Sequence, residues 1–272
     1  MDFGLRGKKA IVTGGSRGIG KAIALELARE GVDVAIVARG GEELAATARE
    51  LAAETGQRVV PLTADVSSRE QVDRMTEQAV QQLGGLHILV NSGAPPGGSA
   101  TAVGPIDTVV DEDLLHDFNV KYVGALRCCR AALPHMKAAG WGRIINISGT
   151  NARTAGNLSG GARNTSLVHL TRTLAQQFGR DGITVNCIHP GITRTERTPG
   201  LLEPRAAKLG ISAAEVEAMD FAPGAPRTNA LGRMVEALEI AYVTVFLASD
   251  KAWAVTGELV VANGGTGAAV YY

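Results

Sequence analysis

The amino-acid sequence predicts an α/β fold, in which one doubly wound parallel sheet of about seven strands has helices on both faces. Short, nearly continuous apolar runs alternate with helical patterns along the 272 residues. A glycine-rich turn separates the first of these runs from the first helix. No linker-like segment and no internal repeat divides the chain, so we predict a single domain over residues 1–272.

Composition restricts the classes of function. Lys plus Arg and Asp plus Glu number 27 each, so no net charge draws the chain to nucleic acid or to a membrane surface. No apolar run reaches transmembrane length, and the N-terminus has no signal-peptide core. The three cysteines show no metal-ligand spacing. We therefore expect a cytoplasmic protein with reduced thiols, a small-molecule substrate and no bound metal.

The first strand and helix flank the glycine-rich turn. Residues 10–12 form the strand, residues 13–20 read TGGSRGIG, and the helix ends at Gly31. Glycines let the backbone approach a diphosphate closely, and the free N–H groups of the helix start face the anion. Glycines also serve plain turns, but the N-terminal position before further strand–helix units favours a nucleotide site. The candidate residues are Gly14, Ser16, Arg17, Gly18, Ile19 and Gly20.

The end of the second strand bears on cofactor choice. Residues 32–38 form this strand, which ends in Ala38 and Arg39 where an NAD-binding protein places an acidic residue for the ribose 2′-hydroxyl. Arg39 and Arg17 are suited to a 2′-phosphate, because a guanidinium matches that group well. We therefore expect NADP(H) to be preferred over NAD(H). The alternative is that both arginines are solvated surface residues.

The remaining elements follow in order. Strands are predicted over residues 57–64, 86–90, 142–148, 183–188 and 258–262, and helices over residues 42–55, 111–139 and 232–247. Ser67 or Ser68 caps a helix to residue 83, and another helix leads from the glycine-rich segment 149–161 to residue 180. Segment 95–105 is a loop near the strand ends. Segment 193–229 has four prolines and no strong period, so we predict a substrate lid.

Several motifs occur in a familiar order. They are Thr13-Gly14-x-x-x-Gly18-x-Gly20, Asp65-Val66, Asn91, Asn119 and Pro190-Gly191. On these motifs the chain resembles a single-domain short-chain dehydrogenase/reductase over almost its whole length. The resemblance implies a Rossmann-like sheet and an oxidoreductase that transfers hydride between NADP(H) and a carbonyl or alcohol substrate. It also implies a homotetramer that pairs the helices after strands four and five and the C-terminal region, including the apolar residues 268–272.

The resemblance implies roles for individual residues. The glycines of the turn would surround the diphosphate, and Asn91 would lie along the cofactor and brace the sheet. Asn119 would support a proton-relay water. Its plainer reading, compatible with the first, is a helix-kinking residue with a backbone partner. The other implied cofactor contacts are Asp65 and Val66 at the adenine, Pro190, Gly191 and Thr193 at the nicotinamide amide, and Thr195 there or at the diphosphate.

The catalytic half of the pattern departs from the family. A serine is normally found after strand five, followed by Tyr-x-x-x-Lys in the next helix, but these positions hold Gly149, Ala162 and Ser166. In the family pattern the tyrosine supplies the proton, and the lysine one turn later lowers its pKa. One candidate substitute is His169, which shares a helix face with residues 162 and 166. Weaker candidates are Arg163, Ser159 and Ser148. A packed or solvated histidine is the plainer reading of His169.

Two classes of function follow. The first is an NADP(H)-dependent oxidoreductase with an atypical active site, in which Asn119, Ser148 or His169 takes part in catalysis. Its acid is then a group of the substrate, a water held by Asn119, or His169. The second is a non-redox protein on the same fold, either a cofactor-binding sensor or regulatory subunit or an enzyme with other chemistry in the emptied pocket. The loss of three catalytic side chains favours the second class, and the intact cofactor motifs favour the first.

Overall fold

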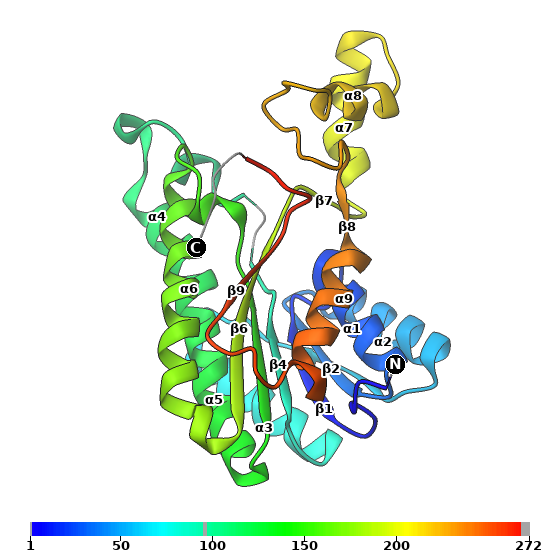
Figure 1. The fold of residues 1–272 in the computed structure, drawn as a ribbon, viewed down its shortest axis with the longest axis vertical. Coiled ribbons are helices and arrows are strands. Elements are labelled where there is room, and N and C mark those ends of the chain that lie inside the picture. The colour runs from blue at the N-terminus through cyan, green and yellow to red at the C-terminus, as the bar shows by residue number, and fades with distance from the viewer. Residues whose placement is uncertain (1, 95–96, 268–272) are drawn as a thin grey trace.

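The predicted doubly wound sheet is present in the structure. The computed structural model describes residues 2–94 and 97–267, and seven parallel strands lie in the order β3-β2-β1-β4-β5-β6-β9 (Figure 1). The strand order reverses between β1 and β4, which is where an open α/β sheet forms a crevice at its carboxyl edge. The strands are β1 Lys9–Thr13, β2 Asp33–Ala38, β3 Val59–Thr63, β4 Ile88–Asn91, β5 Gly142–Ile147, β6 Ile183–Pro190 and β9 Leu259–Ala262.

Two apolar cores lie on opposite faces of the sheet. Val34 and Ile36 of β2 face one core, while Ala35 and Val37 face the other, as the strand period requires. Helices α1 Gly18–Arg29, α2 Gly41–Thr55 and α9 Ala237–Ala248 cover the first core. Helices α3 Arg69–Leu83, α5 Gly124–Ala139 and α6 Leu158–Phe178 cover the second (Figure 1).

The central helical region is interrupted where the family pattern places its asparagine. Helix α4 covers Asp111–Phe118, a π-helical turn covers Asn119–Val123, and α5 follows directly. A π-turn widens a helix locally and is frequent at functional sites.

Short 3₁₀ turns lie in several loops. Predicted loop 95–105 contains the 3₁₀ turn Ala100–Ala102, and further 3₁₀ turns lie at Ile106–Thr108, Thr150–Ala152, Gly179–Asp181 and Asp250–Ala252.

Three helix starts refine or correct the sequence prediction. Ser68 is the cap of α3, because its hydroxyl accepts from the N–H of Gln71. Helix α6 begins at Leu158, inside the predicted glycine-rich segment, because the Asn157 side chain accepts from the N–H of Gly160 at 2.6 Å. Helix α9 begins at residue 237 rather than 232, because β8 Val235–Glu236 first pairs with β7 Thr193–Arg194.

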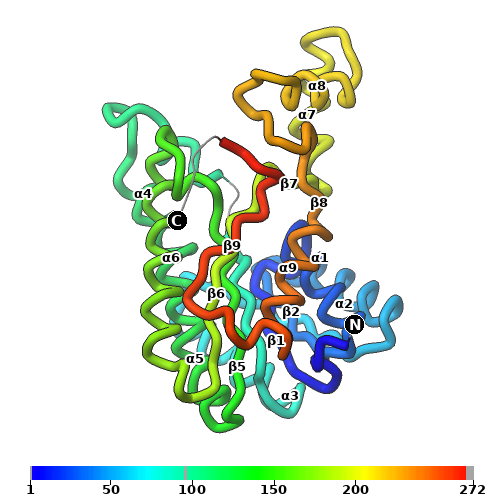
Figure 2. Tube along the Cα trace, in the orientation of Figure 1, coloured from blue at the N-terminus to red at the C-terminus, as the bar shows by residue number. Residues whose placement is uncertain are grey.

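The predicted lid segment 193–229 contains two helices that sequence analysis missed. They are α7 Thr198–Leu209 and α8 Ala213–Asp220, and they stand beyond the carboxyl edge of the sheet (Figures 1 and 2). Their own small core contains Leu202 and Val216. The helix period was hidden because α7 carries a proline in its first turn, where it is tolerated, and another at Pro204 in its interior.

Within residues 2–94 and 97–267, none of the helices combines the length and the apolar character needed to cross a lipid bilayer. All three cysteines are buried and unpaired, as predicted. The predicted burial of residues 268–272 at an interface concerns residues outside the described ranges.

Candidate active site

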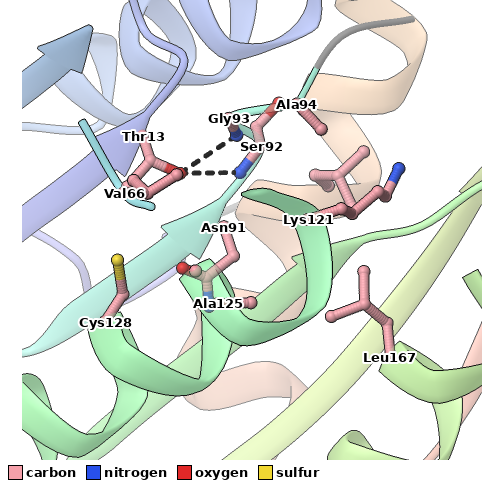
Figure 3. A pocket seen from close by; sticks show the side chains of 12 residues that line it. Thr13, Val66, Asn91, Ser92, Gly93, Ala94, Lys121, Ala125, Cys128 and Leu167 are labelled. Atoms are coloured by element: carbon pink, nitrogen blue, oxygen red, sulfur yellow. Dashed lines mark hydrogen bonds between the residues drawn. The ribbon is translucent and has the colours of Figure 1, made fainter. Parts of the chain in front are cut away.

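The carboxyl ends of β1 and β4 are joined by a single side chain. The hydroxyl oxygen of Thr13 accepts from the N–H groups of Ser92 (3.1 Å) and Gly93 (3.0 Å), as Figure 3 shows. The two strands pair in register, with Thr13 opposite Asn91. The ends of β1 and β4 are therefore held together at the point where the strand order reverses.

The glycine turn needs glycine for steric reasons. Gly14 has φ +69°, and a Cβ there would lie 2.7 Å from the carbonyl oxygen of Ser92. A Cβ on Gly20 would lie 2.2 Å from the carbonyl oxygen of Gly14. The turn thus packs backbone against backbone, which brings the start of α1 close to the crevice. The side chain of Ile19 is partly buried and packs against the first core.

The start of α1 holds an anionic group in this structure. The backbone N–H of Gly18 donates to a carboxylate oxygen of Glu196 at 3.0 Å, and Glu196 lies between β7 and α7. A Cβ on Gly18 would lie 3.5 Å from the Thr195 side chain, so the predicted contact residue Thr195 does lie at the turn. The side chain of the N-cap residue Arg17 makes no capping hydrogen bond. The helix start therefore fits the diphosphate that the resemblance implies.

The two candidate arginines for the 2′-phosphate lie at the surface. Nη1 of Arg17 is 3.9 Å from Oε1 of Glu43, and Oε2 of the same carboxylate accepts from the Ser16 hydroxyl at 3.3 Å. Burial opposes ionisation of Asp65, but hydrogen bonds from Ser67 and the charge of Arg39 lower its pKa overall. Arg39 and Asp65 are thus close enough to interact at the ends of β2 and β3. The geometry is compatible both with a 2′-phosphate site and with solvated arginines.

The other predicted cofactor residues border the same crevice. Asn91 donates to the side-chain oxygen of Asn146 at 2.9 Å and so braces β4 against β5. Val66 packs where a Cβ on Gly124 would meet it at 2.9 Å. Pro190 ends β6, the N–H of Gly191 donates to Ala262 O, and Thr193 donates to Gly191 O at 2.8 Å.

Asn119 begins the π-turn between α4 and α5, so the predicted interruption of the helix is present. The backbone partner expected for its side chain is not among the hydrogen bonds of the described residues. Its amide oxygen accepts from Nη1 of Arg127 at 2.9 Å, and the same nitrogen donates to the carbonyl oxygen of Val66 at 3.2 Å. Arg127, eight residues beyond Asn119, satisfies the amide oxygen because the turn brings the two residues onto one face.

The family's serine position is filled by a neighbouring side chain. Gly149 has an extended backbone, and a Cβ there would lie 2.8 Å from Nδ2 of the buried Asn164. The hydroxyl of Ser148 donates to the carbonyl oxygen of Asn164 at 3.0 Å and is buried. Ser148 therefore ties β5 to α6 in this structure, and its hydroxyl proton is already engaged.

The tyrosine and lysine positions present no acidic group. Ala162 is exposed on α6, and the hydroxyl of Ser166 donates back to the carbonyl oxygen of Ala162 at 2.8 Å. His169 is also exposed on α6. A catalytic role for His169 stays a prediction, without a contact to the crevice among the hydrogen bonds of the described residues.

Lys121 is the residue that sequence analysis passed over. It lies in the π-turn, two residues after Asn119, and its Nζ donates to the carbonyl oxygen of Ser148 at 3.0 Å. Its side chain lines a small cavity together with Asn91, Ser92 and Leu167 (Figure 3). Burial, and then the charge of Arg163, lowers the pKa of Lys121 to about 7. The sequence signal that could have pointed to Lys121 is its position two residues after Asn119, the asparagine of the family pattern.

A second polar group lies beside the family's catalytic positions. The carboxylate of Asp117 is buried and accepts from the Ser159 hydroxyl at 2.5 Å and from the N–H of Ser99 at 2.8 Å. Burial opposes its ionisation, but these hydrogen bonds and Arg163 lower its pKa overall. Arg163 is buried as well. Sequence analysis did not single out Asp117, because its partners are distant in sequence.

His189 at the end of β6 is fully buried. Burial, and then the charges of Arg153 and Lys121, lower its pKa to about 4, so the imidazole is neutral at pH 7. Among the described residues, no group of three or more His, Cys, Asp or Glu side chains is arranged to hold a metal ion.

Comparisons with known proteins agree with this architecture. Residues 14–267 match the family model described as enoyl-(acyl carrier protein) reductase. The chain is 38% identical over 267 residues to the 3-oxoacyl-(acyl-carrier-protein) reductase FabG of Pseudomonas aeruginosa, covering 96% of this chain and 98% of that protein. It is also 31% identical to the (2S)-(hydroxy(phenyl)methyl)succinyl-CoA dehydrogenase subunit BbsD of Thauera aromatica, covering 97% and 98%.

Solved structures give the same result. The L-sorbose reductase of Gluconobacter frateurii, in complex with NADPH and L-sorbose, superposes with a TM-score of 0.90 at 30% identity, covering 97% of this chain and 98% of that one. YwfH, an NADPH-dependent reductase involved in bacilysin biosynthesis, superposes with a TM-score of 0.85 at 28% identity. The sheet order, the glycine turn and these matches together show that the chain belongs to the short-chain dehydrogenase/reductase family and that its relatives are oxidoreductases.

Proposed function

We propose that this protein is an NADP(H)-dependent oxidoreductase that transfers hydride to or from a carbonyl or alcohol substrate through a non-standard active site. The observation that carries the proposal is the start of α1, where the backbone-packed glycine turn leaves the Gly18 N–H bonded to a carboxylate. A diphosphate presents the same kind of anionic oxygen. The NADPH complex of the related L-sorbose reductase supports NADPH as the cofactor.

The residues proposed to hold the cofactor surround the crevice. When bound, NADPH supplies the hydride, and the protein binds and orients it. The proposed contacts are Gly14, Ser16, Arg17, Gly18, Ile19 and Gly20 of the turn, Arg39, Asp65 and Val66 on one side, and Asn91, Pro190, Gly191, Thr193 and Thr195 on the other. Arg17 and Arg39 would recognise the 2′-phosphate, because no acidic residue ends β2.

The proposed catalytic residues differ in how well their surroundings support them. Asn119 lies in the π-turn beside the cavity, which supports a role in holding a relay water. Ser148 is proposed to position the end of β5 through its bond to Asn164. His169 is exposed on α6, and the conservative variant His169→Gln tests whether it contributes to turnover.

The substrate is proposed to be a small carbonyl compound. The names of the relatives describe reduction of 3-oxoacyl groups and of L-sorbose, both of which present a carbonyl carbon. Segment 193–229, with α7 and α8, is proposed to act as the lid of this single domain because it overhangs the carboxyl edge of the sheet (Figure 2). Closure of such a segment would exclude water from the reacting atoms.

The first test is a fluorescence titration with NADPH and NADH side by side. We expect tight NADPH binding and weaker NADH binding. NADPH oxidation is then followed with a 3-oxoacyl thioester and with L-sorbose as probes. A well-folded protein that binds neither nucleotide would contradict the proposal.

A non-redox function is the second candidate, favoured by one observation. Asn164 fills the space where the family's serine would stand, so this altered position is packed rather than vacant. The test combines Gly149→Ser, Ala162→Tyr and Ser166→Lys with Asn164→Ser. Carbonyl reduction that appears only in this variant would favour the non-redox function, whereas turnover by the natural protein would exclude it.

A homotetramer is proposed as the assembly. Leu238, Tyr242 and Phe246 of α9 are spaced four residues apart and partly exposed, which leaves an apolar stripe for a second copy. Light scattering coupled to size exclusion should give four times the mass of 28.2 kDa. Tyr242→Asp should dissociate the assembly. The buried, unpaired thiols are in keeping with the proposed cytoplasmic location.

A further inference from the structure

The proposed reaction needs a proton donor, and the position that supplies it in the family holds Ala162. Helix α6 carries no tyrosine and no lysine between residues 158 and 178. Reduction of a carbonyl places negative charge on the oxygen, so a group that holds a proton near neutral pH must face that oxygen. Such a group must reach the cavity between Asn91 and α6.

Lys121 reaches this cavity from a different helix. Its ammonium group donates one hydrogen bond to the carbonyl oxygen of Ser148 at 3.0 Å, which leaves further N–H bonds to donate. The same cavity is lined by Asn91, Ser92 and Leu167, and Leu167 directly follows the family's lysine position. Figure 3 shows the Lys121 side chain on the α6 side of the cavity. Lys121 is therefore placed between the cofactor-side residues and the altered helix.

The surroundings of Lys121 favour release of its proton. Arg163 of α6 is a neighbouring cation, and it opposes the ammonium charge. Cys187 of β6 acts in the opposite direction on the pKa of Lys121, but burial raises the pKa of this thiol to about 12, so it is neutral at pH 7 and offers no anion. His189, also on β6, is neutral at this pH because its pKa is lowered to about 4. No carboxylate forms an ion pair with Lys121 among the salt bridges of the described residues.

We propose that Lys121 is the catalytic acid of this protein and delivers the proton that tyrosine delivers elsewhere in the family. The proposal rests on the proposed function, since it requires hydride transfer to a carbonyl. The hydride forms a C–H bond at the carbonyl carbon, and the π electron pair of the C=O bond moves to oxygen. One Nζ–H bond of Lys121 breaks as the O–H bond forms. The resulting neutral amine regains its proton from water, and the products are an alcohol and NADP⁺.

One test measures the ionisation of Lys121 without any turnover. Reductive ¹³C-methylation of the protein labels its amines, and the Lys121→Met variant identifies the Lys121 resonance by its loss. We expect this resonance to titrate at about pH 7. A titration above pH 10, the ordinary range of lysine, would overturn the proposal.

The stability of the protein gives an independent readout of the same ionisation. A lysine whose pKa is lower in the folded state than in the unfolded state holds fewer protons when folded between the two pKa values. The free energy of unfolding should therefore rise from pH 7 towards pH 10 in the wild-type protein, relative to Lys121→Met. Equal slopes in the two proteins would contradict the proposal.

A second test separates proton delivery from cofactor binding. NADPH affinity is measured by fluorescence, and single-turnover NADPH oxidation is measured with a 3-oxoacyl thioester or L-sorbose, whichever the wild-type protein reduces. Lys121→Met should lower the rate by roughly 100-fold or more and leave NADPH affinity within about twofold. Lys121→Arg keeps the positive charge, but a guanidinium does not release its proton near pH 7, so the rate should fall as well. The matched control is Lys137→Met on α5, an exposed lysine paired with Asp181.

The outcomes distinguish the role of Lys121 from the proposed NADP(H)-dependent function. A wild-type rate that falls as pH rises through about 7, and a Lys121→Met rate that is low and independent of pH, would support Lys121 as the acid. A loss of NADPH affinity in Lys121→Met would instead make Lys121 a cofactor ligand and overturn the proposal. Failure of the wild-type protein to bind NADPH would overturn the proposed function itself.

Discussion

The two halves of the crevice differ in how they are constrained. The cofactor half is built from backbone, since Gly14 and Gly20 leave no space for a Cβ. The catalytic half is built from side chains on β5, α6 and the π-turn, where Asn164 fills the serine position and Lys121 reaches in from another helix. A backbone site tolerates few residues, whereas a side-chain site accepts substitutes from any element within reach. This difference accounts for the presence of the family's glycine motif in the cofactor half and the absence of its Ser and Tyr-x-x-x-Lys pattern from the catalytic half.

The largest effect is expected from the cofactor half. Gly20→Ala would place a Cβ 2.2 Å from the carbonyl oxygen of Gly14, and the backbone must shift to relieve the overlap. We expect a loss of about 3 kcal/mol in the free energy of unfolding, together with loss of NADPH binding. Chemical denaturation and fluorescence titration measure both. The control is Gly179→Ala, where a Cβ meets nothing within 4 Å.

In the catalytic half, restoring the family's serine at position 149 should lower the stability of the protein. Gly149→Ser places a Cβ 2.8 Å from the amide nitrogen of Asn164, so the buried amide must move. We expect a loss of about 2 kcal/mol in the free energy of unfolding. Adding Asn164→Ser should recover much of this loss, since it removes the opposing atoms. Equal stability of Gly149→Ser and the wild-type protein would show that this half is not packed as described.

The edge of the cofactor half should control nucleotide choice. Arg39→Ala is expected to weaken NADPH binding roughly tenfold and to leave NADH binding unchanged, because a charge-assisted bond to the 2′-phosphate is lost. Titrations with both nucleotides measure the ratio. Arg58→Ala is the matched control, since Arg58 is exposed at the opposite edge of the sheet, before β3. An equal effect on both nucleotides would exclude recognition of the 2′-phosphate by Arg39.

The smallest effect is expected where the lid touches the turn. Glu196 accepts from the Gly18 N–H, at the helix start proposed for the diphosphate. Glu196→Gln removes a negative charge that competes with the cofactor, so NADPH should bind roughly threefold more tightly. Glu203→Gln, on the exposed surface of α7, is the control. Weaker NADPH binding in Glu196→Gln would mean that the carboxylate does not compete with the cofactor.

Most elements of the fold were predictable because each carries its own local signal. The seven parallel strands are short apolar runs, and the turn of Gly14, Gly18 and Gly20 is recognisable from its spacing alone. The helices of the lid were not predictable, since Pro199 and Pro204 hide their period. The start of α9 was also misplaced, because the pairing of β7 with β8 joins residues about forty positions apart in sequence.

The sequence by itself determined the sheet, the glycine turn and the absence of tyrosine and lysine from α6, since these depend on residue type and spacing within one segment. Only the tertiary structure decided what stands in the altered half. Asn164 beside Gly149, Lys121 beside Ser148 and Glu196 at Gly18 are contacts between elements separated along the chain. Such contacts depend on the path of the backbone between the two residues, and no local pattern encodes that path.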